Sequence, residues 1–580
     1  MKINLKKSGL KLKKSLSRFS RHASEDTREH IQENIIDRIS HIKNVKLLIL
    51  EWSLLVASVI FLALTQAYLY NNSYATESYT RGGTYTEGTI GKINSLNPLF
   101  AMTDSEETLA RLLFASLTNP DYSGHIGGDL AKSVSVDKSG KVWTVKLHDN
   151  LKWSDGEPIT NEDVLYTVGV IQDPNTNTNY RNNLASVTVE EKDGAINFNL
   201  RSPNAFFKSS LDFPILPKHI LKDVEHTKLL ENVYSQKPTV TSGAFYFNAS
   251  QNIGTEGEQV VYLNSNEHYY KGKPLLDSFV VHAYTNKDDV IKALNAGTIT
   301  ASAALAAGDQ EKVTSSVMSR RESALDYGTY AFFNLESPTM KNKEIRQAIQ
   351  KGIDIKNIRS VTNGEPALDF PISEKQLTLD KWPELPKQDT AGATKTIAEF
   401  KKAHPDFGSI NIVTISSYDL PDIANKLSEE LKKLGIENTV SIFEPNQDFT
   451  LNILSQRSYD ILIYEIGLGV DPDVFPYYHS SQTTGTGLNF SNYKNAIVND
   501  LILSARNTID ADLRKKKYEN FLNYFVSDVP AIGITQSNLT YFVNNNVRTF
   551  SSENSLASED DRFADVHLWS SIKTIKNRTP

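Results

Sequence analysis

A long apolar run near the N-terminus is followed by segments that alternate between strand and helix patterns. The run extends from Leu47 to Thr65, apart from Glu51, Trp52 and small hydroxyl residues, and continues to Tyr70. As a helix its roughly 19–24 residues would be about 28–36 Å long, which is enough to cross the hydrocarbon core of a bilayer. The pattern therefore predicts one transmembrane helix over residues 47–70.

Beyond residue 80 the spacing of apolar residues changes repeatedly. Strand patterns are predicted for three segments, residues 82–88, 141–148 and 195–201. Leucines at helical spacing predict a helix over residues 108–117. Thr160 followed three residues later by Asp163 predicts the N-terminal cap of a second helix that ends near Ile171.

The C-terminal half contains a β-α-β-α-β pattern. Strands are predicted over residues 410–415, 438–443 and 459–466, with helices over residues 422–434 and 448–456 between them. This alternation is typical of parallel strands that are covered by helices. The fold class is therefore predicted to be α/β with several lobes.

Charge differs on the two sides of the apolar run. Residues 1–46 carry twelve Lys/Arg and five Asp/Glu, a net charge of +7. The whole chain carries −7, and Glu51 contributes −1, so residues 71–580 carry −13. Lys43 and Lys46 precede the run, and no basic residue follows it until Arg81. The positive-inside rule therefore predicts a single-pass protein of the cell membrane with its N-terminus in the cytoplasm and the large part outside. A cleaved signal peptide is the alternative, but the long leader and long apolar run favour an uncleaved anchor.

Composition and motifs exclude several kinds of chemistry. The 580 residues include no cysteine, which excludes disulfides, thiolate metal sites and lipid anchors on cysteine. The nucleotide-binding, serine-hydrolase and zinc-protease motifs do not occur, and the 12 histidines form no pair at helical spacing. The acidic outer part argues against nucleic acid as a partner. We therefore expect a binding protein without catalytic residues, metal site or cofactor.

Several short motifs follow one another along the outer part of the chain. They are Ser95–Phe100, Gly128–Ala131, Leu151–Val164 (LKWSDGEPITNEDV), Phe213–His219, Phe333–Leu335, Ile345–Ile349 with Asp354, and Asp471–Phe490. With these motifs, residues 81–550 resemble the family 5 extracellular solute-binding proteins, the peptide/nickel class that serves ATP-driven importers. Members are usually lipoproteins or free periplasmic proteins, so the apparent helix anchor and the extended basic tail depart from the family.

The resemblance implies an α/β fold of the two-lobed periplasmic-binding-protein type with an inserted third domain, here preceded by one transmembrane helix. In this chain the expected parts are the basic cytoplasmic tail (1–46), the transmembrane helix (47–70), a linker (71–80), lobe I (81–120, 235–330 and 545–580), the inserted domain (121–234) and lobe II (331–544). Residues 301–323 match the family poorly. In such proteins the ligand is held between the lobes by hinge closure.

The resemblance also implies where a peptide would bind. Asp471 or Asp473 occupies the family position of the carboxylate that holds the ammonium terminus of a peptide, although Asp-Pro-Asp also builds turns. Tyr464 and Glu465 lie at the end of the preceding predicted strand, where α/β sheets present ligand contacts. Their other interpretation is a packed aromatic residue and a solvated acid.

Three further residues complete the expected ligand-binding set. Tyr180 and Met102 correspond to cleft-lining positions in peptide-binding relatives, and Asn489 is expected to form hydrogen bonds within the loop that follows Asp473. Trp153 belongs to the most specific of the motifs, but we expect it in the core of the inserted domain.

The resemblance implies a monomeric receptor that captures oligopeptides or dipeptides and delivers them to an ABC permease driven by ATPase subunits. A metal chelate or a sugar as ligand is an alternative within the same fold. A sensor that signals through the membrane anchor and an anchored hydrolase are alternatives of other classes.

Overall fold

The computed structural model describes residues 46–120, 125–254, 257–305, 307–362, 364–417, 419–445, 447–485, 487–551 and 556–577. The chain divides into two compact units, residues 1–78 with 574–580 and residues 79–573, and each is described by itself. The basic tail predicted over residues 1–46 lies outside the described residues except for Lys46.

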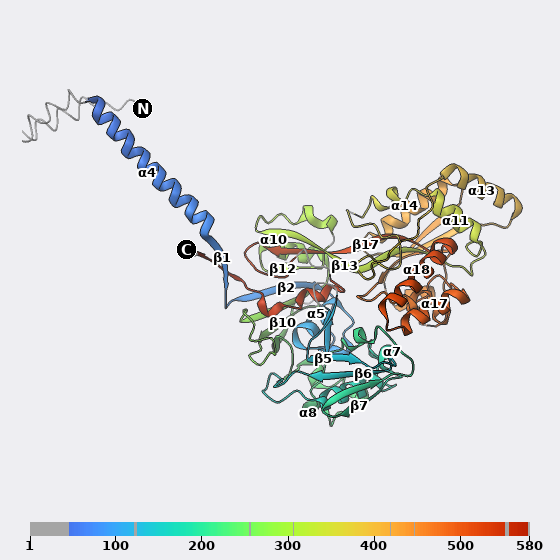
Figure 1. Cartoon of the computed structure of the whole chain (residues 1–580), viewed down its shortest axis with the longest axis horizontal. Helices are drawn as coiled ribbons and strands as arrows, with labels where there is room; N and C mark the ends of the chain where they lie inside the picture. Colours follow the sequence, from blue (N-terminus) through green and yellow to red (C-terminus); the bar gives the residue numbers. More distant parts are fainter. Residues whose placement is uncertain are drawn as a thin grey trace, which may run out of the picture. The chain divides into compact units, whose positions relative to one another are not determined.

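The first unit contains the predicted apolar helix. Helix α4 (Lys46–Tyr74) is 29 residues long (Figure 1). Its apolar stretch Leu50–Leu69 has 20 residues, none buried in the protein, and spans about 30 Å. Beyond it, the segment 71–80 predicted as a linker continues the helix to Tyr74 and then forms β1 (Ala75–Thr80), which pairs with β18 (Ile572–Asn577).

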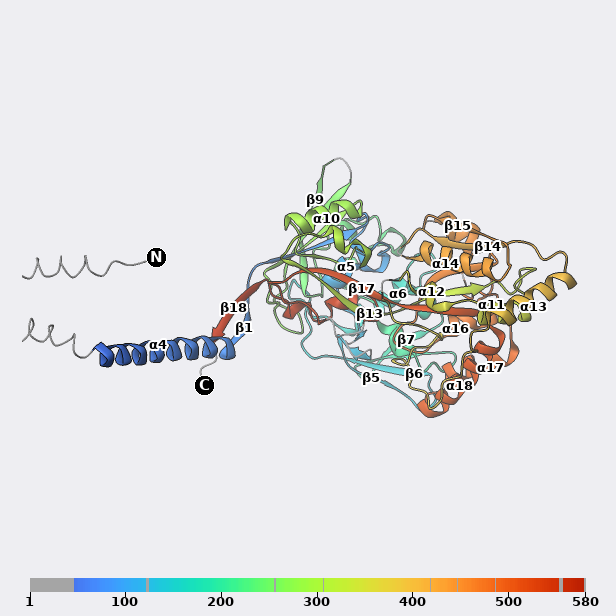
Figure 2. The same ribbon diagram turned by 90° about the horizontal axis from the view of Figure 1, so that it is seen from above.

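A ten-stranded sheet runs through the second unit in the order β15-β14-β16-β13-β17-β12-β2-β11-β10-β9. Its long central strands, β13 (Met318–Phe333) and β17 (Ala531–Asn544), pair antiparallel along most of their length. We call the part built on β12, β2, β11, β10 and β9 lobe I, and the part built on β15, β14 and β16 lobe II. Strands β13 and β17 cross between the two lobes (Figures 1 and 2), which confirms the predicted two-lobed α/β architecture.

Lobe I packs helices α5 (Asp104–Leu113) and α10 (Lys287–Ala296) on its strands. The strands are β2 (Thr84–Ile90), β9 (Phe245–Ile253), β10 (Glu258–Ser265), β11 (Ser278–Tyr284) and β12 (Ala301–Ser302). Helix α5 begins and ends earlier than the predicted 108–117, because Thr103 and Glu106 form a capping box at its start and Phe114 is already extended. The poorly matching region 301–323 forms β12, a turn of 3-10 helix (Ala307–Lys312) and the start of β13.

A third layer is inserted in the chain between α5 and β9. It is an antiparallel sheet in the order β5-β6-β8-β7, with helix α6 (Asn161–Gln172). The strands are β5 (Ala131–Val136), β6 (Val142–Leu147), β7 (Thr188–Lys192) and β8 (Ala195–Asn199). The predicted cap of α6 is confirmed, since the Thr160 backbone N–H donates to the Asp163 carboxylate at 2.8 Å. Trp153 is fully buried, as predicted, in a core that this layer shares with lobe I.

Lobe II confirms the predicted parallel strands. Strand β14 (Ile410–Ile415) pairs in parallel with β15 (Asn438–Phe443) and with β16 (Ile461–Gly467). Helix α14 (Leu420–Lys433) follows β14, whereas the helix predicted over 448–456 is a single short turn, α15 (Gln447–Phe449), that continues into a π-helical turn (Thr450–Leu454). The other helices are α11 (Lys343–Gly352), α12 (Ile355–Arg359), α13 (Thr390–Ala403), α16 (Phe475–Tyr478), α17 (Ala496–Asn507) and α18 (Ala511–Asp528).

Helices cover both faces of the lobe II sheet. Alternate residues of β13 face opposite sides, so that Tyr330 and Phe332 join one hydrophobic cluster while Ala331 and Phe333 join another. Helices α17 and α18 contribute to the first cluster, and α11, α13 and α14 to the second. The strands are therefore buried on both faces, which explains their nearly continuous apolar sequences.

Candidate functional site

Three cavities of the second unit share lining residues and form one cleft between the lobes. The first, which we call the acidic cavity, is lined from Ala303 and Glu559 in lobe I to Glu465 in lobe II. The middle cavity shares all three of these residues with it. The arginine cavity, on the side of the inserted layer, shares Glu107 and Asp560 with the middle cavity. A ligand in this cleft would contact both lobes and the crossing strands.

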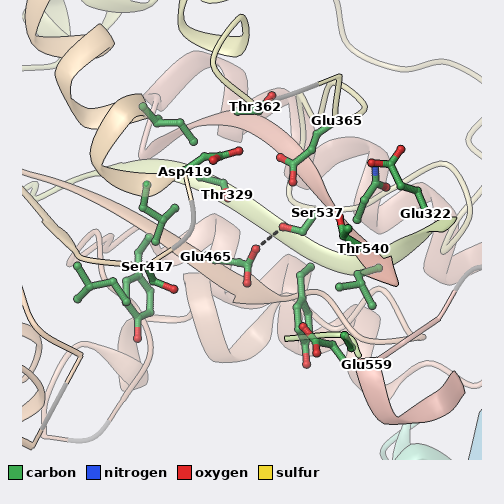
Figure 3. Close-up of a pocket in the computed structure, with 18 of the residues that line it drawn as sticks. Glu322, Thr329, Thr362, Glu365, Ser417, Asp419, Glu465, Ser537, Thr540 and Glu559 are labelled. Carbon is green, nitrogen blue, oxygen red and sulfur yellow. Dashed lines mark hydrogen bonds between the residues drawn. The ribbon is translucent and has the colours of Figure 1, made fainter. Parts of the chain in front are cut away.

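Five carboxylates line the acidic cavity, and none of the lining residues that the structure describes is a lysine, arginine or histidine (Figure 3). The carboxylates belong to Glu322, Glu365, Asp419, Glu465 and Glu559. Because they come from both lobes, from a crossing strand and from a loop, the tertiary structure alone brings them together.

Two of these carboxylates lie at the carboxyl ends of parallel strands. Glu465 is close to the end of β16, and Asp419 lies between the end of β14 and the start of α14. Open α/β sheets bind ligands at this edge because side chains and helix starts converge there. The parallel pattern of lobe II therefore places both acids at the cleft.

Glu365 is positioned by a loop that lies against the crossing strands. The backbone N–H of Gln536 donates to the Pro366 carbonyl at 2.9 Å, and that of Leu368 donates to Ile534 at 3.2 Å. A Cβ atom on Gly533 would lie 2.3 Å from the Leu368 carbonyl oxygen, so glycine is required for this close approach.

Burial raises the pKa values of the acidic cavity. It raises the pKa of Glu365 to about 7 and the pKa of Glu559 to about 8, against 4.5 for an ordinary glutamate. Burial also raises the pKa of Glu465, although the Ser537 hydroxyl donates a hydrogen bond to this carboxylate and lowers the pKa in part (Figure 3). The desolvated carboxylates repel one another, so the site favours a ligand that brings positive charge.

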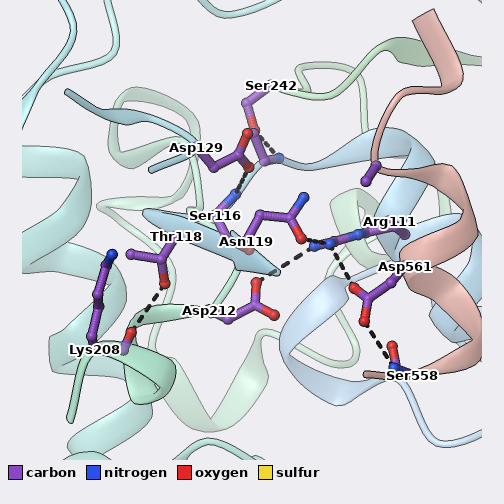
Figure 4. A network of polar contacts seen from close by, with 12 residues as sticks. Arg111, Ser116, Thr118, Asn119, Asp129, Lys208, Asp212, Ser242, Ser558 and Asp561 are labelled. Atoms are coloured by element: carbon purple, nitrogen blue, oxygen red, sulfur yellow. Dashed lines mark hydrogen bonds and ion pairs between the residues drawn. The ribbon is translucent and has the colours of Figure 1, made fainter. Parts of the chain in front are cut away.

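The arginine cavity contains a compact ionic network (Figure 4). The Arg111 guanidinium lies 3.5 Å from the carboxylate of Asp212 and 3.0 Å from that of Asp561, and it also donates a hydrogen bond to the Asn119 side chain. Burial raises the pKa of Asp212 to about 6 despite the neighbouring arginine. This network links α5, the inserted layer and the C-terminal segment, and thus forms the wall of the cleft in lobe I.

Three of the residues predicted to bind ligand line the cleft. Tyr464 and Glu465 line the acidic cavity, and Tyr180 lines the arginine cavity. Burial raises the pKa of Tyr464, so its hydroxyl stays protonated at neutral pH and can donate a hydrogen bond. Met102 is 79 % exposed and lines none of the three cavities.

The two predicted anchor carboxylates line none of the three cavities and are in contact with other side chains. Asp471 accepts a hydrogen bond from the Ser209 hydroxyl of the inserted layer. Asp473 forms an ion pair with Arg506, whose Nε atom is 3.1 Å from Asp473 Oδ2. Burial raises the pKa of both aspartates. Asp473 already has a cationic partner, whereas Asp471 is neutralised by no ion pair within the described residues.

Asn489 is a structural residue of its loop in this arrangement. Its side chain is fully buried. Its amide group donates to the carbonyls of His479 and Tyr493 and accepts from the Tyr493 N–H at 3.0 Å. The hydrogen bonding predicted within the loop is therefore present, but no atom of the side chain is exposed to meet a ligand.

Several cleft residues were not predicted from the sequence. Glu365, Glu559 and Arg111 belong to none of the recognised motifs and lie far apart in the chain. The only local signal is the acidic segment that begins at Ser558, where Ser558 and Asp561 form a capping box. That signal predicts a helix start and gives no indication of a cavity.

A two-lobed α/β architecture with crossing strands and a cleft between the lobes defines a receptor for small solutes. Residues 125–487 match the bacterial extracellular solute-binding proteins, family 5. The chain belongs to this family, as its motifs indicate.

Known proteins are similar to this chain along most of its length. The oligopeptide-binding protein AppA of Bacillus subtilis is 28 % identical over 526 residues, which are 84 % of this chain and 93 % of AppA. The solved structure of the ABC transporter substrate-binding protein CtaP from Listeria monocytogenes matches with a TM-score of 0.73 and 26 % identity, over 84 % of this chain and 99 % of CtaP. The structure of NikZ from Campylobacter jejuni in complex with Ni(L-His) matches with a TM-score of 0.70 and 21 % identity, over 84 % of this chain and 99 % of NikZ. At this identity the match shows the fold alone.

Proposed function

We propose that this protein is a membrane-tethered receptor that captures oligopeptides or dipeptides outside the cell and delivers them to an ABC permease and its ATPase subunits. The observation that carries the proposal is the continuous cleft lined by both lobes, in a chain that is similar to an oligopeptide-binding protein along most of its length. The protein would bind the ligand and release it chemically unchanged. The domain boundaries predicted from the sequence are part of this proposal.

Within the cleft, peptide and receptor would interact through charged and polar groups. We expect Tyr464, Glu465 and Tyr180 to contact the ligand, and the support for this is that each lines a cavity. Of the two aspartates, we assign Asp471 to the ammonium terminus of the peptide, since no ion pair within the described residues neutralises it. Asp473 would position the loop through its ion pair with Arg506.

Closure of the lobes is supported by contacts between the inserted layer and lobe II. Phe206 is 6 % exposed and packs in the hydrophobic cluster of lobe II. The Ala205 N–H donates to the carbonyl of Arg506 at 2.8 Å, and the Ser209 hydroxyl donates to Asp471. A peptide that fills the cleft and is covered by both lobes must enter when these contacts are open. Hinge bending would then occur in β13 and β17, whose pairing is irregular between Ala324 and Gly328.

The membrane anchor is the remaining part of the proposal. Helix α4 has the length and composition of a spanning helix, and the basic residues before it favour a cytoplasmic N-terminus. Protease added to intact cells is expected to remove the receptor part and leave a membrane-bound fragment of about seventy residues. Release of the receptor without added protease would show that the helix is cleaved as a signal peptide.

Equilibrium dialysis of the full-length protein in detergent tests the ligand class. The dialysis would use a tryptic peptide pool, with maltose and nickel–histidine in parallel, and mass spectrometry would identify the retained compounds. Retention of peptides is expected. Retention of maltose or nickel–histidine, with no peptide retained, would contradict the proposal.

A further inference from the structure

Most carboxyl groups of the acidic cavity lack a cationic partner in the protein. Glu365, Glu465 and Glu559 form no ion pair with any residue that the structure describes. Glu322 is the exception on the cavity wall, since Arg320 contacts its carboxylate. The cleft therefore contains at least three carboxyl groups that have no cationic partner among the described residues and could pair with a cationic ligand.

The guanidinium nearest in the chain to Glu559 is already paired elsewhere. Arg562 lines the middle cavity, but its Nη2 atom lies 3.1 Å from the Glu87 carboxylate and its Nη1 atom 3.5 Å from that of Asp560. Glu87 is completely buried. Because removal of a partner from a buried charge is costly, Arg562 stays with Glu87; its charge partly offsets the rise in the pKa of Glu559, but it forms no ion pair with this carboxylate.

Two threonines also line this cavity. Thr329 on β13 is 3 % exposed and Thr540 on β17 is 7 % exposed, and both line the cavity (Figure 3). A threonine hydroxyl can accept an N–H group, so these two residues add acceptors to the carboxylates for a ligand that supplies N–H donors.

The spread of the carboxylates fits an organic cation better than a metal ion. Within the described part of the chain, no three His, Asp or Glu residues are close enough to hold a metal ion. The acids are instead distributed around a cavity that opens into the cleft. An ammonium or guanidinium group on a flexible stem can enter such a cavity while several carboxylates and hydroxyls accept its N–H groups.

We propose that the acidic cavity binds a lysine or arginine side chain of the peptide, and that this receptor therefore selects cationic peptides. The inference rests on the proposed function, because it names the class of peptide taken by the same cleft. The pKa values of Glu365 and Glu559, which are raised mainly by burial, agree with it, since a bound cation would offset the cost of ionising these carboxyl groups in the cavity.

Calorimetric titration of the full-length protein in detergent tests the selection. The probes are pentapeptides of alanine with one lysine at each of the five positions in turn, compared with matched peptides that contain acetyl-lysine or glutamate. We expect a lysine at one or more positions to bind at least tenfold more tightly than acetyl-lysine, and glutamate to bind more weakly than either. Equal affinities within about threefold at all five positions would overturn the inference.

A second arm separates the side chain from the peptide terminus, which is also an ammonium group. The lysine preference should persist when the N-terminus of every peptide is acetylated, even if all affinities fall. A preference that disappears with N-terminal acetylation would show that the cavity holds the terminus and would overturn the inference. Failure of all the peptides, including the all-alanine peptide and the tryptic pool, would contradict the proposed function itself.

Two variants locate the effect. Glu465→Gln keeps an oxygen for the Ser537 hydroxyl and removes the charge, and it should reduce the preference for lysine over acetyl-lysine at least threefold. Glu344→Gln changes an exposed acid on α11 outside the cleft and should leave the preference unchanged. An equal effect of the two variants would attribute the preference to overall charge and contradict the assignment to the cavity.

Discussion

Replacement of Glu559 by glutamine is expected to stabilise the protein at neutral pH. Burial raises the pKa of this carboxyl from 4.5 to about 8, with further contributions from Asp104, Asp560 and Glu465, while Arg562 acts in the opposite direction. In the unfolded chain the group is ionised at pH 7, whereas in the folded protein it is held largely protonated. The gap of about 2.5 pH units between 4.5 and pH 7 corresponds to roughly 3 kcal/mol of lost stability.

The pH dependence has a definite sign. A carboxyl whose pKa is raised by folding contributes full stability below pH 4.5, and this contribution is lost as the pH rises toward 8. Glutamine does not titrate. The stability gained by Glu559→Gln should therefore be about 3 kcal/mol at pH 7 and under about 1 kcal/mol at pH 5.

Urea unfolding followed by tryptophan fluorescence, at both pH values and in the same detergent, measures this difference. Glu344→Gln, at an exposed site on α11, is the matched control and should change the stability little at either pH. A Glu559→Gln variant that is no more stable than the wild type at pH 7, or that gains equally at pH 5, would refute the reasoning. The gain would also show that this buried acid is retained at a cost to stability.

Three further predictions concern the lobes and the ligand. Phe206→Ala should lower the free energy of unfolding by roughly 3 kcal/mol, because the ring is buried in the lobe II cluster; an unchanged urea midpoint would contradict that packing. The higher affinity for lysine peptides than for acetyl-lysine peptides should shrink from pH 8 to pH 6. Glu365 and Glu559, with pKa values of about 7 and about 8, take up protons in that range. A difference in affinity that stays constant would exclude these acids as its source. Asp471→Asn should weaken the binding of peptides with a free N-terminus by about tenfold, or 1.4 kcal/mol, and that of N-acetylated peptides much less. If Asp471→Asn lacks this effect, the assignment of Asp471 fails, and if Asp473→Asn lacks it as well, neither aspartate holds the terminus.

Much of the architecture could be predicted because it depends on local signals. The cap formed by Thr160 and Asp163, the strand β14 and the apolar helix were each visible in short windows of sequence. The limits of α5 were misplaced because Leu117 continues the leucine spacing, although it is buried in the segment after the helix has ended at Leu113. A period of apolar residues indicates which side chains are buried but does not distinguish the element from the extended chain that packs beside it.

The ligand site was only partly predictable for a different reason. Tyr464 and Glu465 could be placed because the carboxyl end of a parallel strand is a general ligand position. Glu365 depends on close packing of its loop against Gly533, and Glu559 on the docking of a C-terminal segment into lobe I. Asn489 shows the converse, since a motif position turned out to be fully buried. Such long-range contacts leave no periodic signal in the sequence.

The central claim is that this cleft holds peptides, and native mass spectrometry of the full-length protein as purified from cells tests it most directly. Ligand released in the spectrometer and then sequenced should consist of intact peptides of mixed sequence, enriched in lysine and arginine relative to the peptides of the medium. A sugar or a metal chelate as the bound species would contradict the account.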